Sequence, residues 1–325
     1  MKIEKKQWRL ITSALLLLGI VFLLSLFVGQ YPLHIKNLWQ GDEQAIRVFM
    51  TLRFPRTCMA ALTGAALGIV GMIYQTVFQN PLASPDIIGV SSGACAGAAF
   101  AILFCTGSSL MVTLCAFGGS LSAVILALGL AVLVPKRGNI TIVLSGLAVQ
   151  SLAQTILMTL KLTADPEKEL AAIEYWIMGS LHAITGKDVW FPFGVVMVST
   201  IILGYLYRQI LMLSMEEEEA AMLGVSVSKM RLMILLLATL MVAAVVCVTG
   251  VIGFVGLIAP HCARMVMKNS RIETLWFSGI LGSVFLLIAD ILARSVAASE
   301  LPVSVFTTLV GVPFLIGLML RKDNS

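Results

Sequence analysis

The sequence predicts an all-α, polytopic membrane protein with about ten transmembrane helices. Of its 325 residues, 59% are hydrophobic and only 12% are charged, and the mean hydropathy is +0.98. A soluble domain carries about 25% charge. The apolar residues gather in segments of about 18 to 25, each long enough to cross a hydrocarbon core of about 30 Å. In lipid such segments must be helices, because every backbone polar group needs an internal partner. We therefore expect one transmembrane domain over 1–325.

The apolar spans follow one another along the whole chain. They cover 10–29, 57–78, 88–106, 109–134, 140–162, 189–212, 231–250, 251–267, 274–296 and 303–320. The boundaries are least defined at 231–267, which could be one long helix, and at 88–134, where Gly and Ser blur them. The first span could belong to a signal peptide. It is long, however, and lacks a clear small-x-small cleavage site, so we expect a retained first helix. The outer loop 163–188 is expected to hold a short interfacial helix.

Lysine and arginine set the expected orientation, because they are enriched in cytoplasmic loops. With the basic segment 2–9 placed inside, the loops and termini put 14 basic residues in the cytoplasm and 8 outside. Both termini are then cytoplasmic, and the polar segment 214–231 lies inside. Arg53, Arg56 and Arg294 fall on the outer side, where basic residues need an explanation.

The segment 214–231 is polar and lies between two long apolar spans. Four acids at 216–219 precede Ala220, Leu223 and Val227, whose spacings of three and four place them on one helical face. Gly224 can end this helix, because glycine tolerates the left-handed conformation of a helix stop. We expect a short amphipathic helix outside the bilayer. A solvated loop with a run of charge is the alternative.

Two arginines stand just before the second span. Arg53 and Arg56 are three residues apart, and Pro55 between them suits the first turn of a helix. One interpretation is snorkelling of both side chains to the membrane interface. The other is an electropositive rim that pairs with acids on a docking partner. Further along, Asp290 and Arg294 are four apart and predict a local ion pair.

Small and amide side chains inside the spans give two further predictions. Gly64 and Gly68 have the spacing that allows close approach of a second helix. Gln150 and Gln154 are four apart on one face of the fifth span. Amides within a membrane segment usually face protein or a water-filled cavity. They are candidate pathway residues, and helix-to-helix contact is an equally consistent role.

No catalytic or metal-binding constellation is recognisable in the sequence. It contains no phosphate-binding glycine loop, no H-E-x-x-H and no plausible Ser-His-Asp set. The six cysteines have no C-x-x-C spacing and lie mostly in apolar segments, so neither a disulfide framework nor a metal site is expected. Charges within the spans are nearly absent, which argues against proton relays and ion-coupled transport. A pathway of this kind needs energy from another subunit.

Several motifs of this sequence resemble those of a known family, the type II ABC import permeases for iron-siderophores, haem and vitamin B12 (FecCD-like transmembrane subunits). The matching pieces run in family order over nearly the whole chain. They are LRFPR at 52–56, Gln75 with NPLASP at 80–85, GVSSGA at 89–94, WIMGS at 176–180, Ala220 with 223–224, GFVGLIAPH at 253–261 with Arg264, 289–290 with Arg294, and ELPV at 300–303. Ser304 departs from a frequent Gly, and 267–271 lacks a common Asp-His pair. Neither departure affects the assignment.

The resemblance implies a set of partners rather than an activity of this chain alone. It implies a dimer of permeases, identical or different, and two cytoplasmic ATPase subunits that bind ATP and Mg. It also implies an extracytoplasmic binding protein and a place in the bacterial cytoplasmic membrane. No enzyme activity and no directly bound cofactor are expected of this subunit.

The same resemblance implies roles for individual residues. Residues in the segment 214–231 would form a coupling helix that contacts the ATPase, the outer arginines would pair with acids of the binding protein, and the fifth span would line the pathway with a cytoplasmic gate at its start. The coupling residues are Glu217, Glu218, Ala220, Leu223 and Gly224, the docking residues are Arg53, Arg56 and Arg294, and the gate and pathway residues are Asn139, Ile140, Gln150 and Gln154.

The expected function is therefore ATP-driven import of an iron-siderophore. Import of haem or a corrinoid is the alternative within the family, and nothing in this sequence separates these cargoes. A secondary transporter or channel working alone would need acids or an ion site inside the membrane, and the spans offer little of either. A membrane enzyme would need clustered Asp, Glu or His in the spans, which the sequence lacks.

Overall fold

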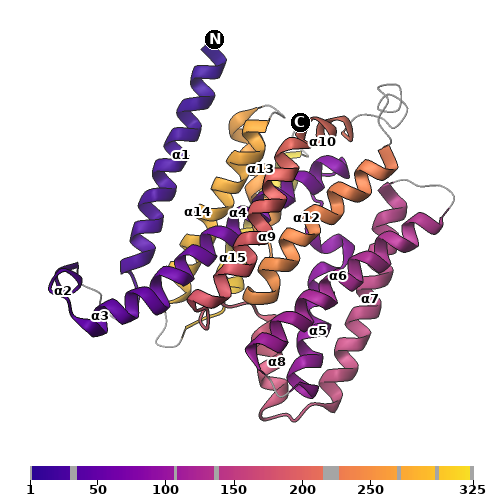
Figure 1. Cartoon of the computed structure of the whole chain (residues 1–325). Helices are drawn as coiled ribbons and strands as arrows, with labels where there is room; N and C mark the ends of the chain where they lie inside the picture. The colour runs from indigo at the N-terminus through magenta and orange to yellow at the C-terminus, as the bar shows by residue number, and fades with distance from the viewer. Residues whose placement is uncertain are drawn as a thin grey trace. The chain divides into compact units, whose positions relative to one another are not determined.

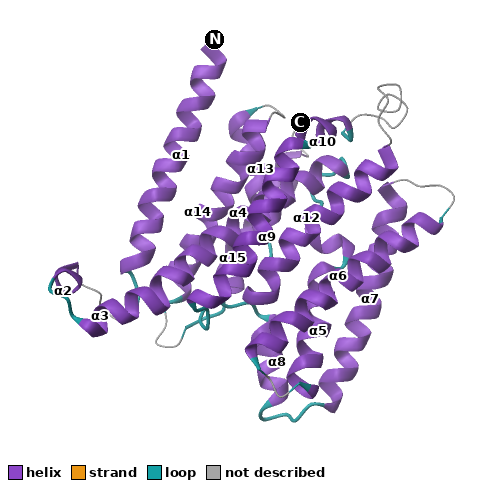
Figure 2. Cartoon of the chain, viewed as in Figure 1, coloured by secondary structure: helices purple, strands orange, loops and turns teal. Residues whose placement is uncertain are grey.

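The computed structural model describes residues 2–29, 35–105, 108–134, 139–214, 227–268, 272–296 and 300–322. All regular secondary structure in these ranges is helical (Figure 2). Contacts divide the chain into two compact units. Unit one comprises Met1–Ile69, Gly179–Trp190 and Ile252–Ser325, and unit two comprises Val70–Met178 and Phe191–Val251.

The predicted spans correspond one to one with apolar helices of the described ranges. Seven helical segments are long and apolar enough to cross a membrane, and three shorter apolar helices accompany them. The helices are α1 (Lys2–Phe27), α4 (Phe54–Val77), α5 (Val90–Phe104), α6 (Ser109–Leu133), α7 (Asn139–Thr163), α9 (Gly186–Tyr205), α12 (Val227–Thr249), α13 (Val255–Met267), α14 (Ile272–Ala293) and α15 (Val303–Lys322). The predicted all-α membrane fold is confirmed.

Shorter helical pieces connect or extend the spans. They are α2 (Ile35–Trp39), α3 (Glu43–Val48), the π-helix η1 (Phe49–Arg53), the 3-10 helix η2 (Pro85–Ile88), α8 (Glu169–Ile177) and α10 (Tyr207–Met212). The short helix expected in the loop 163–188 is α8. The predicted span 189–212 is divided at Leu206 into α9 and α10.

The interval 231–267 contains two helices, so the single long helix is excluded. The break covers 250–254, between α12 and α13. Gly250 has a φ of +70° and Phe254 a φ of +67°. The positive φ at these two positions interrupts the helical hydrogen-bond ladder. Glycine adopts it without strain, whereas Phe254 holds an uncommon backbone conformation.

Unit one is built on α14, which packs against α1, α13 and α15. The first half of α4 crosses α14 closely, since Gly64 faces Gly282 and Gly68 faces Ser278. Ser278 Oγ donates a hydrogen bond to the Gly68 carbonyl at 2.7 Å, and Ser283 Oγ donates to the Ala61 carbonyl at 2.7 Å. Close helix approach at the glycines of the second span is therefore confirmed.

Unit two contains an antiparallel pair, α5 and α6, with α7 packed against both. Gly93 and Gly97 of α5 lie against Gly119 and Cys115 of α6, and Gly146 of α7 lies against Ile87 of η2. Small residues thus allow the backbones to approach, as is usual between membrane helices. Tyr74, at the end of α4, pairs its hydroxyl with that of Thr239 on α12 at 2.8 Å.

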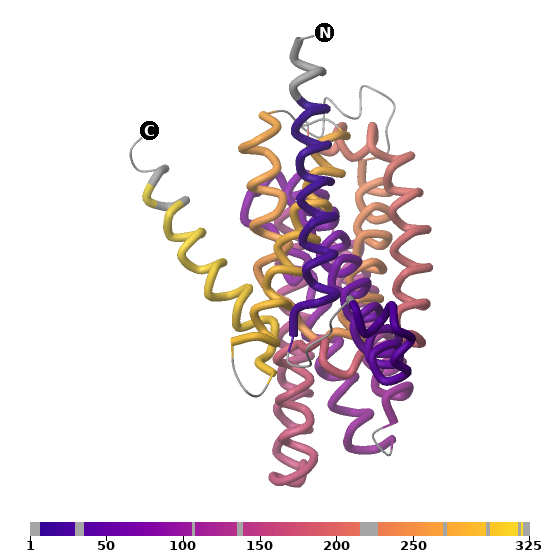
Figure 3. The backbone as a smooth tube through the Cα atoms, turned by 90° about the vertical axis from the view of Figure 1, so that its left-hand side faces the viewer, coloured from indigo at the N-terminus to yellow at the C-terminus, as the bar shows by residue number. Residues whose placement is uncertain are grey.

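The directions of α1 and α15 define the two ends of unit one. Figures 1 and 3 show the start of α1 and the end of α15 at the same end of this unit. The last turn of α1, the end of α14 and the start of α15 therefore lie at its opposite end. With cytoplasmic termini, as expected from the sequence, that opposite end faces the outside.

Candidate functional site

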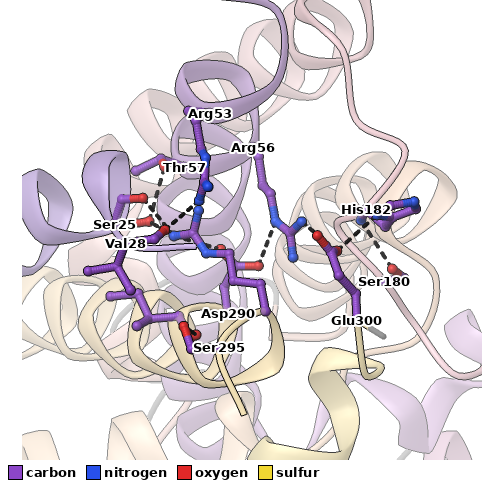
Figure 4. Close-up of polar contacts among 12 residues, drawn as sticks. Ser25, Val28, Arg53, Arg56, Thr57, Ser180, His182, Asp290, Ser295 and Glu300 are labelled. Carbon is purple, nitrogen blue, oxygen red and sulfur yellow. Dashed lines mark hydrogen bonds and ion pairs between the residues drawn. The ribbon is translucent and has the colours of Figure 1, made fainter. Parts of the chain in front are cut away.

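The end of unit one opposite the termini carries a network of charged side chains (Figure 4). Each member comes from the end of a helix or from an adjoining loop. They are Ser25 and Val28 at the end of α1, Arg53, Arg56 and Thr57 at the start of α4, Asp290 and Arg294 at the end of α14, Glu300 before α15, and His182 before α9. Four parts of the chain that are distant in sequence therefore meet here: 25–28, 53–57, 182 and 290–300.

Arg56 connects two carboxylates within the network. Its Nε donates to Asp290 Oδ1 at 2.9 Å, and its Nη1 donates to Glu300 Oε2 at 2.7 Å. The side chain of Arg56 is 8% exposed, that of Asp290 is 0% exposed and that of Glu300 is 21% exposed. Such short, charge-assisted hydrogen bonds are the strong class of hydrogen bond. Arg56 thus joins the start of α4 to the end of α14 and to the loop before α15.

Arg294 ties the end of α14 to α1. Its Nη2 lies 3.4 Å from Asp290 Oδ2 and donates to the Ser25 carbonyl oxygen at 2.7 Å and to Ser25 Oγ at 2.6 Å. The ion pair that the spacing of Asp290 and Arg294 predicts is confirmed. Asp290 consequently lies between two guanidinium groups, and Ser25 is a partner that the sequence did not indicate.

Arg53 completes the cationic side of the network. Its Nη1 donates a hydrogen bond to the Val28 carbonyl oxygen just after α1. Gly29 makes this approach possible, because a Cβ at that position would overlap the guanidinium group. Thr57, one residue beyond Arg56, shares a 3.0 Å hydrogen bond with Ser25 through their hydroxyl groups. The start of α4 is thus held against the end of α1 by polar contacts.

Glu300 and His182 form the accessible edge of the network. His182 Nδ1 lies 2.9 Å from Glu300 Oε2, and the His182 side chain is 58% exposed. The His182 amide donates to Ser180 Oγ at 3.1 Å, which fixes its loop locally. Burial raises the pKa of Glu300, but the hydrogen bond and charge of Arg56, with a further contribution from His182, lower it below its ordinary value. Glu300 is therefore ionised at neutral pH.

The structure brings together the three arginines predicted to form an outer rim, but it buries them. Arg53 and Arg56 are each 7% exposed and Arg294 is 1% exposed. Each has a partner within this chain, so the guanidinium groups do not form an open positive surface. Docking to a partner's acids remains a prediction. Sequence reasoning missed Glu300 and His182 as members of the network.

Charge is unbalanced within the network. Among the described residues that compose it, three arginines face two carboxylates, those of Asp290 and Glu300.

A second candidate site is the polar face of α7 in unit two. Gln154, Ser151, Thr155 and Thr159 are exposed, whereas Gln150 is half-buried. The three hydroxyls donate to the carbonyl oxygens four residues before them, each at 2.9 Å. Gln154 lies on the same side of the helix, so its amide can meet a solute or a second subunit. The pathway role of Gln150 and Gln154 stays a prediction.

The predicted gate residues begin α7. Ile140 is 77% exposed. Asn139 Oδ1 is buried and has no hydrogen-bond partner among the described residues. A buried amide oxygen without a hydrogen-bond partner is costly. The predicted coupling residues Glu217, Glu218, Ala220, Leu223 and Gly224 lie outside the described residues.

Apolar helices of membrane-spanning length define a multi-pass membrane protein, and the charged end with a polar helix face is suited to a transport subunit. A sequence profile described as the FecCD transport family matches residues 16–321, and the chain belongs to that family. The resemblance seen in the sequence is confirmed. The protein is thus a multi-pass permease of the ABC importer class, located in the bacterial cytoplasmic membrane.

Individual relatives cover almost the whole chain. It is 38% identical over 281 residues to the cobalamin import system permease protein BtuC of Halobacterium salinarum, which spans 86% of this chain and 75% of that protein. It is 34% identical to the hemin transport system permease protein HmuU of Yersinia pestis, with 98% of each chain covered. A solved structure described as an inward-facing metal-chelate type ABC transporter aligns with a TM-score of 0.88 and 31% identity, over 97% of this chain and 99% of that chain.

Proposed function

We propose that this chain is the transmembrane subunit of an importer that moves a ferric siderophore into the cytoplasm. The observation that supports this most directly is the structural similarity to a transporter described as metal-chelate type, which extends over 97% of the chain. Haem and corrinoids are the second candidates, because relatives of similar identity are named for hemin and for cobalamin. All three cargoes are large metal chelates, so one wide pathway suits each of them.

In this proposal the energy comes from partner subunits. Two permease subunits, identical or different, pair with two ATPase subunits, which bind ATP and Mg. An extracytoplasmic binding protein delivers the cargo at the end of unit one that carries the arginine network. The segment 214–231 couples ATP hydrolysis to the permease. This permease itself carries out no covalent chemistry.

The cargo can be identified by ATP hydrolysis in proteoliposomes. The chain is reconstituted with the ATPase encoded beside it, and the binding protein is added empty or loaded with ferric siderophore, haem or cobalamin. We expect stimulation by the loaded binding protein, and the strongest stimulation with ferric siderophore. If the chain forms no complex with any ATPase, yet moves solute down an ion gradient, a transporter that works alone replaces this proposal.

The coupling segment has a sharper test. Replacing Leu223 or Gly224 with Asp puts a charge on the face expected to enter the ATPase, so stimulated hydrolysis should be lost while the chain still inserts in the membrane. Ser214→Asp is a matched control, because Ser214 is exposed just after α10. Equal losses in the control and in the two variants would contradict a specific coupling role for Leu223 and Gly224.

The pathway role of α7 predicts access to water at Gln154. A cysteine at this position, in a variant without the six native cysteines, should react with a water-soluble maleimide, because a thiolate forms in water and not in hydrocarbon. Leu16→Cys is the control, since Leu16 is 70% exposed on α1, a helix expected to face lipid. We expect labelling on the order of tenfold faster at 154. Equal rates would place Gln154 against lipid or protein.

A further inference from the structure

Glu300 stands between the buried part of the arginine network and solvent. Exposure of the side chains falls from His182 at 58% to Glu300 at 21%, Arg56 at 8% and Asp290 at 0%. Figure 4 shows Glu300 between the Arg56 guanidinium and the His182 ring. A single oxygen, Glu300 Oε2, contacts both neighbours, at 2.7 Å from Arg56 Nη1 and 2.9 Å from His182 Nδ1. A carboxylate that approached Arg56 from outside would therefore meet the carboxylate of Glu300 first.

From this arrangement we infer that Glu300 is an internal competitor for docking. It occupies the outer side of the Arg56 guanidinium until a carboxylate of the binding protein replaces it. The inference rests on the proposed function, because it assigns that binding protein an acidic contact. Glu300 thus lowers the affinity of docking instead of supporting it. In the free permease Glu300 covers the outer side of Arg56, and docking remains readily reversible.

Glu300, and not Asp290, is the exchangeable partner of Arg56. Asp290 is fully buried on α14 and also pairs with Arg294, so its removal would leave Arg294 without its acidic partner and Arg56 with Glu300 alone. Glu300 belongs to the short connection between α14 and α15. The amide of Leu301, next to it, donates to the Ala293 carbonyl oxygen at 3.0 Å, which holds this connection near the network. The side chain of Glu300 can turn away while this backbone tie stays intact.

The charges of the network allow the exchange. An arriving carboxylate would take the place of Glu300 beside Arg56, while Asp290 stays in contact, so Arg56 keeps two anionic partners throughout. The released Glu300 retains His182, which lies on its solvent side. As long as Glu300 stays beside Arg56, its negative charge repels the arriving acid and opposes docking. Loss of the negative charge at position 300 therefore has a predicted sign, which is tighter docking.

A positioning role for Glu300 would change the docking affinity in the opposite direction. If Glu300 orients Arg56 for the partner, its removal loosens the guanidinium and weakens docking. A purely structural role would lower the melting temperature without strengthening docking. Only a competitor gives higher affinity on removal of its charge, so the direction of the change identifies the role of Glu300.

The test compares Glu300→Gln with wild type in complexes of the permease with its ATPase in lipid nanodiscs. The probe is the binding protein encoded beside this chain, and its dissociation constant is measured by surface plasmon resonance. We expect docking about tenfold tighter for Glu300→Gln. The gain should be larger at low salt, where charge interactions are screened less. Glu300→Asp, with a carboxylate one methylene shorter, should show a smaller gain.

Two controls separate this result from general charge effects. Glu167→Gln removes an exposed acid on the same predicted side, outside the network, and should leave docking unchanged. In an Arg56→Gln background the effect of Glu300→Gln should disappear, because the competition needs the guanidinium. Unchanged or weaker docking of a well-folded Glu300→Gln complex would overturn the inference. A wild-type complex that fails to bind the binding protein would instead contradict the proposed function.

Discussion

Replacing Asp290 with alanine is expected to destabilise the protein by about 3–5 kcal/mol, the usual loss when one partner of a buried ion pair is removed. Asp290 is 0% exposed and accepts a hydrogen bond from Arg56 while lying 3.4 Å from Arg294. Without it, two guanidinium groups remain buried with Glu300 as the one carboxylate of the network. Arg294 would keep its contacts with Ser25 but lose its counter-charge.

The variants are compared by their free energy of unfolding, which is measured by denaturant titration of the detergent-solubilised protein. Asp290→Asn should lose less than Asp290→Ala, because its amide oxygen can still accept from Arg56 Nε. The matched control is Glu174→Ala, which breaks an ion pair of 2.9 Å with Lys161 whose side chains are 45% and 26% exposed. Exposed pairs contribute about 0–1 kcal/mol. Similar losses for Asp290→Ala and the control would show that the network adds little stability.

Much of the fold could be predicted because the membrane imposes it. Backbone polar groups in lipid must pair within a helix, so a long apolar run has one available conformation. The helices accordingly match the predicted spans, including α8 in the outer loop. The separate spans 231–250 and 251–267 also match two helices, but hydropathy left one long helix over 231–267 open as an alternative. The helix breaks at 250–254. The segment is apolar on both sides, and the break depends on the backbone conformation of Gly250 and Phe254.

The candidate site shows the same limit more clearly. The pair Asp290–Arg294 could be predicted, because a spacing of four residues places both on one helix face. Arg56 is 234 residues from Asp290 and 244 from Glu300, so those bonds exist only once α4, α14 and the start of α15 have packed. The distribution of basic residues along the sequence identified three arginines on the outer side, where basic residues are uncommon. Tertiary packing turned the expected exposed rim into a buried network.

Close packing of glycines on α4 and α14 gives the second large expected effect. A Cβ at Gly64 would overlap the carbonyl oxygen of Gly282 and lie 2.7 Å from the Cα of Ser283. Both of these atoms belong to the backbone of α14, so no side chain can turn away to relieve the overlap. Gly64→Ala should therefore push the two helices apart and cost about 1–3 kcal/mol. Gly64→Leu should cost more and reduce the yield of folded protein.

The reciprocal change, Gly282→Ala, tests the geometry from the other helix, because a Cβ there would overlap the Gly64 carbonyl oxygen. Gly118→Ala on α6 is the control, since apart from its own helix turn no atom of the described residues lies within 4 Å of its added Cβ. That change should stabilise the helix by roughly 0.5–1 kcal/mol, because alanine has the higher helix propensity. If alanine destabilises the protein at position 64 but stabilises it at position 118, the loss at 64 comes from the helix contact and not from helix propensity. If Gly64→Ala were as stable as Gly118→Ala, α4 and α14 would be farther apart than the structure shows. The hydrogen bonds from Ser278 and Ser283 to the α4 backbone would then also be absent, since they depend on the same close approach.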